Sequence, residues 1–292
     1  MRHDWRRRAW GRLQNVRVRV EDAGGGVAWI RMRSFGASML GMEVAAYLVG
    51  DILVDTGFSY MREPLLAALE DREINLVCCT HSHEDHTGNC AAVAAAHGCI
   101  VYLRHPEAQW EVGELPLKPY RRFWWGQVEE FGAHEMPDVV ESGGRRFEIV
   151  PTPGHSNTQV ALFEKETGDV FTGDLFISPG ATAVLIWEDP WTAAASLRRV
   201  AALNPRRMFT GHGLAIDDPA PRLGLKAERI EAAARRSVEL TARGLPPRQV
   251  VRKVFPNGNG RDRFFEWLTS REFSRLNFVH AAIRHAPKSF QR

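Results

Sequence analysis

Three histidines and one aspartate lie within six residues in the run from His81 to His86, which reads His-Ser-His-Glu-Asp-His. Histidine nitrogens and carboxylate oxygens are the ligands that zinc takes at about 2.0 to 2.2 Å, so this density of ligands predicts a metal site. In an extended backbone alternate side chains point to the same side, so His81 and His83 can share one ion. Asp85 and His86 follow a bend of the chain and can face a second ion. The alternative is a polar loop with surface histidines, but this does not explain why so many potential ligands lie within six residues.

Three more candidate ligands lie apart from this run, each directly after a predicted strand and beside a glycine. They are His155 in Pro-Gly-His-Ser, Asp174 in Thr-Gly-Asp-Leu and His212 in Gly-His-Gly. A strand end can deliver a side chain to a site, and a glycine lets the backbone approach that site closely. Each residue alone would more often be a structural histidine or a turn aspartate, but together with the first run they predict one metal centre.

The elements expected around these residues alternate between strands and helices. Strands are predicted over 74–80, 100–103, 147–151, 159–164, 169–172 and 208–210, and helices over 62–71, 91–97 and 193–203. The candidate ligands therefore lie in loops after strands, where an α/β protein can point several side chains into one place. Two β-rich halves with helices outside them predict an α/β fold, a four-layer αββα sandwich.

Three parts of the chain are expected. Residues 1–26 form a basic N-terminal arm, for which solvation is favoured over phosphate binding; its arginines are Arg6, Arg7, Arg8, Arg12, Arg17 and Arg19. Residues 27–215 are expected to form the domain that holds the candidate ligands, and residues 216–292 a helical C-terminal module that begins with a linker-like stretch over 217–221. A basic stripe in this module is expected to be a solvated helix face, and its members are Arg222, Lys226, Arg229, Arg235 and Arg236.

The composition is that of an ordinary globular protein. Of 292 residues 44% are hydrophobic and 25% charged, which excludes disorder for most of the chain, and a net charge of +3 is too small to indicate nucleic-acid binding by itself. We find no apolar run typical of a secretory signal or a membrane span, so a cytoplasmic protein with no membrane partner is expected. The cysteines lack C-x-x-C spacing and are expected to be buried thiols; they are Cys78, Cys79, Cys90 and Cys99.

The run from His81 to His86, followed by His155, Asp174 and His212, resembles the metallo-β-lactamase-fold superfamily over about residues 27–215. Asp55-Thr56-Gly57 resembles an early strand-end signature of the same family. The resemblance implies a binuclear metal-dependent hydrolase, with two zinc ions favoured and manganese or iron as alternatives. In that family pattern His81, His83 and His155 would hold the first ion, Asp85, His86 and His212 the second, and Asp174 would bridge the two.

The resemblance also implies how these residues act. A hydroxide shared by the two ions would attack the substrate, because metal ions lower the pKa of bound water from 15.7 towards about 7. Asp85 is the candidate catalytic proton acceptor. Asp55, Thr80 and Ser156 are candidates for the outer residues that orient the ligands, since a ligating histidine usually donates its other ring N–H. Glu84 is expected to point away from the ions, into solvent or a salt bridge.

The substrate is less constrained, because one scaffold serves many reactions. An ester, thioester or lactone-type small molecule is favoured. The C-terminal module is loosely similar to the winged-helix-like tail of β-lactamase-like endoribonucleases, so a phosphodiesterase acting on single-stranded RNA is the alternative. A glyoxalase II-like thioesterase is disfavoured, because Gly213 and Leu214 follow His212 where that family has Glu-Tyr. A non-catalytic metal-binding scaffold is an alternative from another class, and the presence of all seven ligands disfavours it.

An aromatic and basic segment over 104–138 has two open interpretations. Its residues of interest are Trp110, Lys118, Tyr120, Arg121, Arg122, Phe123, Trp124, Trp125 and Phe131. They could receive an apolar or anionic substrate at the mouth of the site. They could equally pack in the core or in a homodimer interface. The run Asp189-Pro190-Trp191 poses the same choice.

Overall fold

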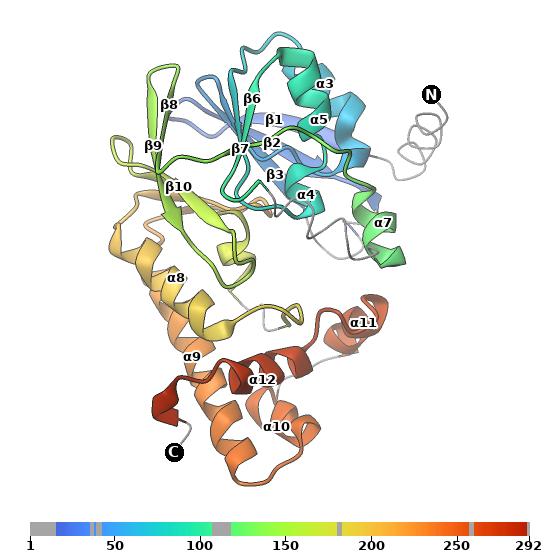
Figure 1. Cartoon of the computed structure of the whole chain (residues 1–292), viewed down its shortest axis with the longest axis vertical. Coiled ribbons are helices and arrows are strands. Elements are labelled where there is room, and N and C mark those ends of the chain that lie inside the picture. Colours follow the sequence, from blue (N-terminus) through green and yellow to red (C-terminus); the bar gives the residue numbers. More distant parts are fainter. Residues whose placement is uncertain are drawn as a thin grey trace. The chain divides into compact units, whose positions relative to one another are not determined.

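A computed structural model describes residues 16–35, 38, 43–106, 118–179, 183–256 and 260–290 (Figure 1). It divides into two compact units. The first comprises Met1–Val150, Val160–Asp174 and Arg206–Asp217, and the second comprises Pro151–Gln159, Leu175–Pro205 and Asp218–Arg292. Most of the expected basic arm, including Arg6, Arg7, Arg8 and Arg12, lies outside the described residues, as does Trp110.

The first unit contains a seven-stranded sheet in the order β1-β2-β3-β4-β5-β6-β7. Its strands are β1 (Arg17–Asp22), β2 (Val27–Arg33), β3 (Val44–Val49), β4 (Ile52–Val54), β5 (Leu76–Cys78), β6 (Ile100–Leu103) and β7 (His134–Glu135). Strands β1 to β4 form antiparallel pairs, whereas β4 to β7 run parallel to one another. The loops that follow β4 and β5 therefore leave the same edge of the sheet.

A six-stranded sheet follows in the order β13-β12-β11-β10-β9-β8. Its strands are β8 (Val139–Ser142), β9 (Arg145–Pro151), β10 (Val160–Glu164), β11 (Asp169–Phe171), β12 (Arg207–Phe209) and β13 (Ala215–Asp217). Only β11 and β12 form a parallel pair among the registers described for this sheet. Parallel pairing places the ends of these two strands, and thus the loops holding Asp174 and His212, side by side.

The core between the two sheets is aromatic. Tyr47 in β3 lies 5.2 Å from Phe171 in β11 and 5.3 Å from Phe209 in β12, measured between ring centroids. Phe171 and Phe209 stack on each other at 5.1 Å, and the Tyr47 hydroxyl donates to the carbonyl oxygen of Thr210 at 2.7 Å. Such ring pairs contribute about 0.5 to 1.5 kcal/mol each beyond their buried area. They hold the strand ends that carry the candidate ligands.

Short helices accompany the seven-stranded sheet. They are η1 (Ser59–Met61), α3 (Arg62–Leu69), α4 (Glu84–Thr87), α5 (Cys90–His97) and α7 (Pro119–Trp125), and η2 (Gly173–Phe176) follows β11 in the other sheet. Helix α5 ends at Gly98, whose φ of +66° is the left-handed conformation that glycine adopts without steric cost. The chain then continues into β6.

The second unit is helical. Its helices are α8 (Pro190–Ala202), α9 (Ala220–Ala242), α10 (Pro247–Val254), α11 (Gly260–Leu268), α12 (Arg275–Arg284) and η3 (Lys288–Phe290). Ala234, Phe278 and Ala282 form one buried cluster, against which Trp191 packs, and Leu240, Val250 and Val279 form another. The indole N–H of Trp191 donates to the carbonyl oxygen of Ala282 at 2.9 Å. Of the two interpretations open for Asp189-Pro190-Trp191, packing therefore accounts for the tryptophan.

The α/β fold expected from the sequence is confirmed, as is the helical C-terminal region. Residues 17–22, expected in the basic arm, instead form β1, because Val18 and Val20 alternate with polar residues and pair with β2. Strand β13 continues to Asp217, slightly beyond the boundary expected near Ala215. The four cysteines are free thiols; Cys78, Cys79 and Cys90 are buried and Cys99 is partly exposed.

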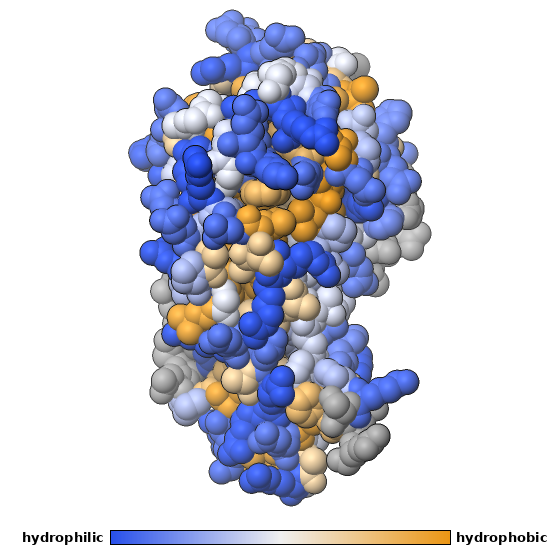
Figure 2. Space-filling view, turned by 90° about the vertical axis from the view of Figure 1, so that its left-hand side faces the viewer, coloured by the Kyte–Doolittle hydropathy of each residue, from blue (hydrophilic) through white to orange (hydrophobic). Residues whose placement is uncertain are grey.

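The surface is polar over most of the face in Figure 2, with smaller hydrophobic areas between hydrophilic ones. Scattered apolar residues of this kind are normal on folded proteins. Among the described residues, no helix combines the length and the apolar character that crossing a membrane requires.

Candidate metal centre

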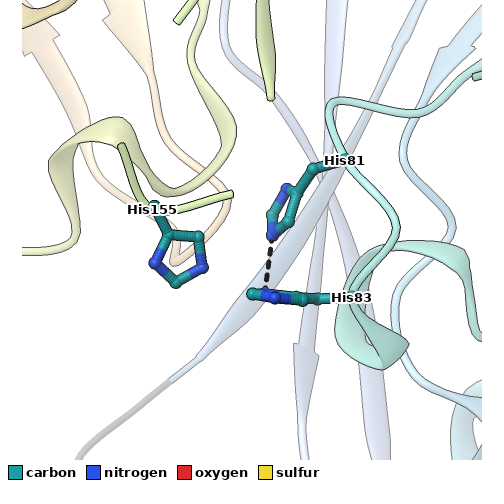
Figure 3. Close-up of side chains that lie close together, drawn as sticks. All are labelled: His81, His83 and His155. Atoms are coloured by element: carbon teal, nitrogen blue, oxygen red, sulfur yellow. Dashed lines mark hydrogen bonds between the residues drawn. The ribbon is translucent and has the colours of Figure 1, made fainter. Parts of the chain in front are cut away.

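His81 and His83 lie in the loop between β5 and α4, and both side chains are buried. Nε2 of His81 lies 2.9 Å from Nδ1 of His83, so these two nitrogens face the same point. His155 lies in the loop from β9 to β10, and Figure 3 shows its ring beside the other two. One nitrogen from each of the three rings lies within 4.8 Å of the others.

A second group consists of Asp85, His86, Asp174 and His212, again with one ligand atom from each within 4.8 Å of the others. Asp174 lies between two rings, with Oδ1 at 3.3 Å from Nε2 of His86 and Oδ2 at 3.2 Å from Nε2 of His212. Asp85 Oδ2 lies 3.9 Å and 3.8 Å from the same two nitrogens. The structure thus brings all seven sequence-predicted ligands into two groups of three and four.

Asp55 orients His86 in this second group. Its Oδ2 lies 2.7 Å from Nδ1 of His86, which leaves Nε2 facing Asp85 and Asp174. Thr80 secures the carboxylate, donating its backbone N–H to Oδ1 at 2.7 Å and its hydroxyl to Oδ2 at 2.9 Å. The Thr80 hydroxyl also lies 3.1 Å from Nδ1 of His81. Asp55 and Thr80, two of the predicted outer residues, therefore lie directly behind two of the expected ligands.

His212 is oriented by a main-chain atom. Its Nδ1 lies 2.9 Å from the carbonyl oxygen of Glu43, so Nε2 is the atom that faces Asp174. Glu43 is held in turn by Arg31, which donates to its carboxylate at 2.6 Å, and by Arg33. Sequence reasoning missed Glu43, because a backbone carbonyl carries no residue-type signal.

Two glycines allow the close approach that this group requires. A Cβ on Gly211 would meet Cε1 of His86 at 2.5 Å and Oδ1 of Asp174 at 2.8 Å. Gly173 has a φ of +49°, and a Cβ there would meet the Thr80 hydroxyl at 2.5 Å. A side chain at position 211 would push these ligands apart, and one at position 173 would displace Thr80, which explains why glycine precedes both Asp174 and His212.

The charges in this group favour a cation. Burial lowers the pKa of His86, but the carboxylates of Asp55, Asp174 and Asp85 outweigh it and raise that pKa well above its usual value. Burial likewise lowers the pKa of His212, yet Asp174 raises it to about 9. Burial raises the pKa of Asp174, while His212 and His86 outweigh burial and hold it well below its usual value. Buried carboxylates thus draw positive charge to the point where the ligand atoms meet.

The donor set fits metal ions. Nε2 of His86 is buried and, among the described residues, has no hydrogen-bond partner, although the other ring nitrogen is bonded to Asp55. A buried polar atom without a partner is costly unless something else satisfies it. Imidazole nitrogens and carboxylate oxygens are the ligands of zinc, manganese and iron sites. His86, Asp85, Asp174 and His212 could therefore hold one ion, and the three histidines of the other group a second.

Ser156 is not positioned as predicted. Its hydroxyl lies 3.1 Å from the hydroxyl of Thr158 and accepts the Thr158 backbone N–H at 3.3 Å, because the residues after His155 form a tight turn. The carboxylate found beside His155 is instead Glu188, with Oε1 at 3.2 Å from Nδ1. Glu188 lies far from His155 in the sequence, and no local pattern marks the contact.

Glu84 points away from the ligands and forms a buried salt bridge, one of the two outcomes expected for it. Arg121 in α7 donates to both of its carboxylate oxygens, at 2.6 Å and 2.5 Å. Trp125 packs edge-on against Phe58 at 5.2 Å, and its carbonyl oxygen accepts the hydroxyl of Ser59 at 3.1 Å.

Most described aromatic residues of the 104–138 segment are buried, namely Tyr120, Trp124, Trp125 and Phe131, whereas Phe123 is 40% exposed. These four side chains are therefore packed within the chain, which is one of the interpretations left open for the segment.

Lys226 departs from the solvated face expected for the basic stripe. It is buried because Leu223, Ala227 and Ala234 share its side of α9 at helical spacing. Its ammonium group donates to the carbonyl oxygen of Ser178. The other four members of the stripe are exposed, as expected.

Comparison with known proteins gives one family. Residues 41–212 match the model of the metallo-beta-lactamase superfamily, which is more than half of the chain. A Drosophila melanogaster protein named beta-lactamase-like protein 2 homolog is 27% identical over 61% of this chain and 61% of its own length. Thioesterase pkgB of Emericella nidulans is 30% identical over 58% of this chain and 46% of its own length. The chain thus spans less than two thirds of these relatives.

Solved structures agree in fold. A beta-lactamase domain protein from Burkholderia ambifaria matches with a TM-score of 0.63 and 17% identity, covering 89% of this chain and 86% of its own. The structure of TTHA1623 in a di-iron-bound form matches with a TM-score of 0.52 and 28% identity, covering 64% and 93%.

Proposed function

Because this chain belongs to the metallo-beta-lactamase superfamily, we propose that it is a hydrolase that binds two metal ions and cleaves an ester, thioester or lactone-type small molecule. One observation carries the proposal. Seven histidine and aspartate side chains converge from separate loops into two groups, each with its ligand atoms within 4.8 Å. The presence of both groups disfavours a non-catalytic metal-binding scaffold.

In this proposal His81, His83 and His155 would hold one ion, and Asp85, His86 and His212 would hold the other. Asp174 lies in the second group, where its two oxygens face His86 and His212, and it would be the carboxylate that the two ions share. A shared carboxylate reduces the repulsion between two dications a few ångströms apart. Zinc suits the histidine-rich set, and the di-iron-bound form of TTHA1623 makes iron the main competitor.

When bound, the ions supply a Lewis acid and a water molecule of lowered pKa. The chain supplies orientation and a proton acceptor. Asp55 and the Glu43 carbonyl hold the rings of His86 and His212 so that Nε2 of each faces the centre. Asp85 presents its Oδ2 to the same point and is the carboxylate that would accept the proton of the attacking water.

A thioester is the substrate class that we favour. Three relatives bear thioesterase names, including the Emericella nidulans thioesterase pkgB and an Aspergillus fumigatus protein named atrochrysone carboxyl ACP thioesterase, which is 28% identical over 63% of this chain. These names describe proteins of which this chain spans only part. They support the ester and thioester class over a phosphodiester, and they do not carry over a particular acyl group.

The test is turnover by protein whose metal content has been measured. The panel contains an acyl thioester, an acyl-homoserine lactone, bis-(p-nitrophenyl) phosphate, a single-stranded RNA and a chromogenic cephalosporin. Two ions per chain and chelator-sensitive cleavage of the thioester or lactone would support the proposal. Cleavage of RNA or the phosphodiester alone would replace it with the endoribonuclease alternative. Binding of two ions without cleavage of any panel member would count against the proposed substrate class.

A further inference from the structure

A carboxylate without a role in the proposed reaction contacts one of the candidate ligands. Glu188 Oε1 lies 3.2 Å from Nδ1 of His155, and the two side chains are 13% and 7% exposed. Both residues belong to the second unit. At this distance the ring nitrogen and the carboxylate oxygen are within hydrogen-bond range, and solvent weakens a mostly buried contact of this kind little.

The backbone around Glu188 holds its carboxylate in place. The Glu188 N–H donates to the carbonyl oxygen of Leu185 at 3.2 Å, while its Oε1 accepts the Leu185 N–H at 2.9 Å, so the turn is closed twice. The next residue, Asp189, donates its N–H to the carbonyl oxygen of Gly154 at 2.9 Å. The turn with Glu188 is therefore tied directly to the residue that precedes His155.

The His155 loop is also fixed to the start of α8. A Cβ on Gly154 would meet the backbone of Ala193 at 2.5 Å, so the two segments approach as closely as glycine allows. The Ser196 hydroxyl donates to the carbonyl oxygen of Pro153 at 2.7 Å. These contacts leave the imidazole and the carboxylate little freedom to separate.

A buried cation acts on the same carboxylate. Lys226 of α9 interacts electrostatically with Glu188, and its ammonium nitrogen lies 4.8 Å from the ring centre of Phe176.

We propose that Glu188 is a positioning residue for His155: it accepts the proton on Nδ1 and so fixes the tautomer and ring orientation that leave Nε2 for a metal ion. The inference rests on the proposed function in one respect, namely that His155 binds the ion held with His81 and His83. Carboxylates behind ligating histidines tune metal affinity by about 10-fold to 100-fold. Glu188 is therefore a determinant of one ion site and not of the other.

The experiment measures metal affinity rather than turnover. The full chain and its Glu188→Ala and Glu188→Gln variants are stripped with a chelator and titrated with Zn²⁺ against a competing indicator, which resolves the two sites. Glu228→Gln, on the exposed face of α9, is the matched control. We expect Glu188→Ala to weaken one site by about 10-fold to 100-fold. Glu188→Gln should weaken it less, because an amide oxygen still accepts, and the other site and the control should be unchanged.

A background with His155→Ala identifies the affected site. There, Glu188→Ala should cause no further loss of affinity. Unchanged affinity at both sites in folded Glu188→Ala would overturn the inference, as would an equal loss with and without His155. If Glu188→Ala does not fold, the near-isosteric Glu188→Gln decides, and a change of less than about twofold overturns it. A wild-type chain that binds two ions but cleaves no substrate would refute the proposed function, while the affinity pattern would still decide the role of Glu188.

Discussion

Asp55 is the residue whose replacement tests most directly how the second ligand group is oriented. Its Oδ2 lies 2.7 Å from Nδ1 of His86 and accepts the Thr80 hydroxyl at 2.9 Å, and its Oδ1 accepts the Thr80 N–H at 2.7 Å. Its φ of 60° lies in the left-handed region, which asparagine also adopts. Asp55→Asn therefore removes the charge and one acceptor without changing the backbone requirement.

The expected size of the effect follows from the bond that is lost. If the asparagine oxygen keeps the Thr80 N–H, its amide N–H₂ faces the ring N–H of His86, and two donors cannot bond. His86 must then turn, or carry its proton on Nε2, which is the atom that faces Asp174 at 3.3 Å. A hydrogen bond to a charged group contributes about 1.5 to 3 kcal/mol. At 1.36 kcal/mol per factor of ten, metal affinity should fall about 10-fold to 100-fold.

The assay is competitive Zn²⁺ titration of the stripped protein, with thermal unfolding measured in parallel. Asp51→Asn is the matched control, because Asp51 is also buried and its Oδ2 accepts from Asn75 at 2.7 Å and Ser142 at 2.6 Å, outside the ligand groups. We expect Asp51→Asn to lower stability and leave metal affinity unchanged. Affinity of Asp55→Asn within about twofold of the wild type would refute the orientation argument.

Three further outcomes are expected. His83→Ala or Asp174→Ala should abolish hydrolysis and leave the circular dichroism spectrum intact; undiminished turnover in either purified variant contradicts the mechanism. In metal-free protein the His212 pKa of about 9 keeps the ring protonated at pH 7, so metal binding should release protons and strengthen as pH rises towards 9, which calorimetry in two buffers measures. Burial lowers the pKa of Lys226 to about 8, below its value in the unfolded chain, so wild-type stability should rise between pH 8 and about 10.5 by about 3 kcal/mol relative to Lys226→Met. If the free energy of unfolding depends on pH in the same way for both proteins, burial of the Lys226 ammonium group does not cost this stability.

The seven side chains that the structure groups were predictable because their signals are local. Their types are those of metal ligands, and each lies in a loop after a strand, where the fold itself directs side chains to one edge of a sheet. Asp55 and Thr80 were predictable for a related reason, since β4 and β5 are adjacent parallel strands whose ends lie together. Local sequence patterns therefore predict most of the residues of the metal centre.

The remaining contacts depend on tertiary structure. The partner of His212 is the carbonyl oxygen of Glu43, and every residue has such an atom, so no residue type marks it. Ser156 was the expected neighbour of His155, but a tight turn directs its hydroxyl to Thr158. Glu188 takes that place because a turn before α8 returns to Gly154. Neither adjacency in sequence nor residue type can anticipate this geometry.

Lys226 shows why a charge pattern alone misleads. A basic stripe usually marks a solvated face, and four of its five members are exposed. The fifth lies one residue before Ala227, on the side of α9 that packs inward, and helical spacing could have indicated this. Burial of its ammonium group is tolerable because Ser178 accepts a hydrogen bond and Glu188 supplies a negative charge. The basic stripe predicts that Lys226 is exposed, whereas the apolar spacing predicts that it is buried. The structure agrees with the apolar spacing.

Glu84 shows how a ligand loop decides the role of a distant segment. Alternation with the ligands predicts that it points away from the ions, and the structure buries it completely. A buried carboxylate is costly unless a cation satisfies both of its oxygens. The composition of the segment over 104–138 allows substrate contact or packing, yet Arg121 from this segment donates to both oxygens of Glu84. The need for a cation follows once burial is known, but its source does not, because 37 residues separate the pair. The ion pair between Glu84 and Arg121 therefore holds helix α7 against the ligand loop. The aromatic residues Tyr120, Trp124 and Trp125 of the same helix are buried.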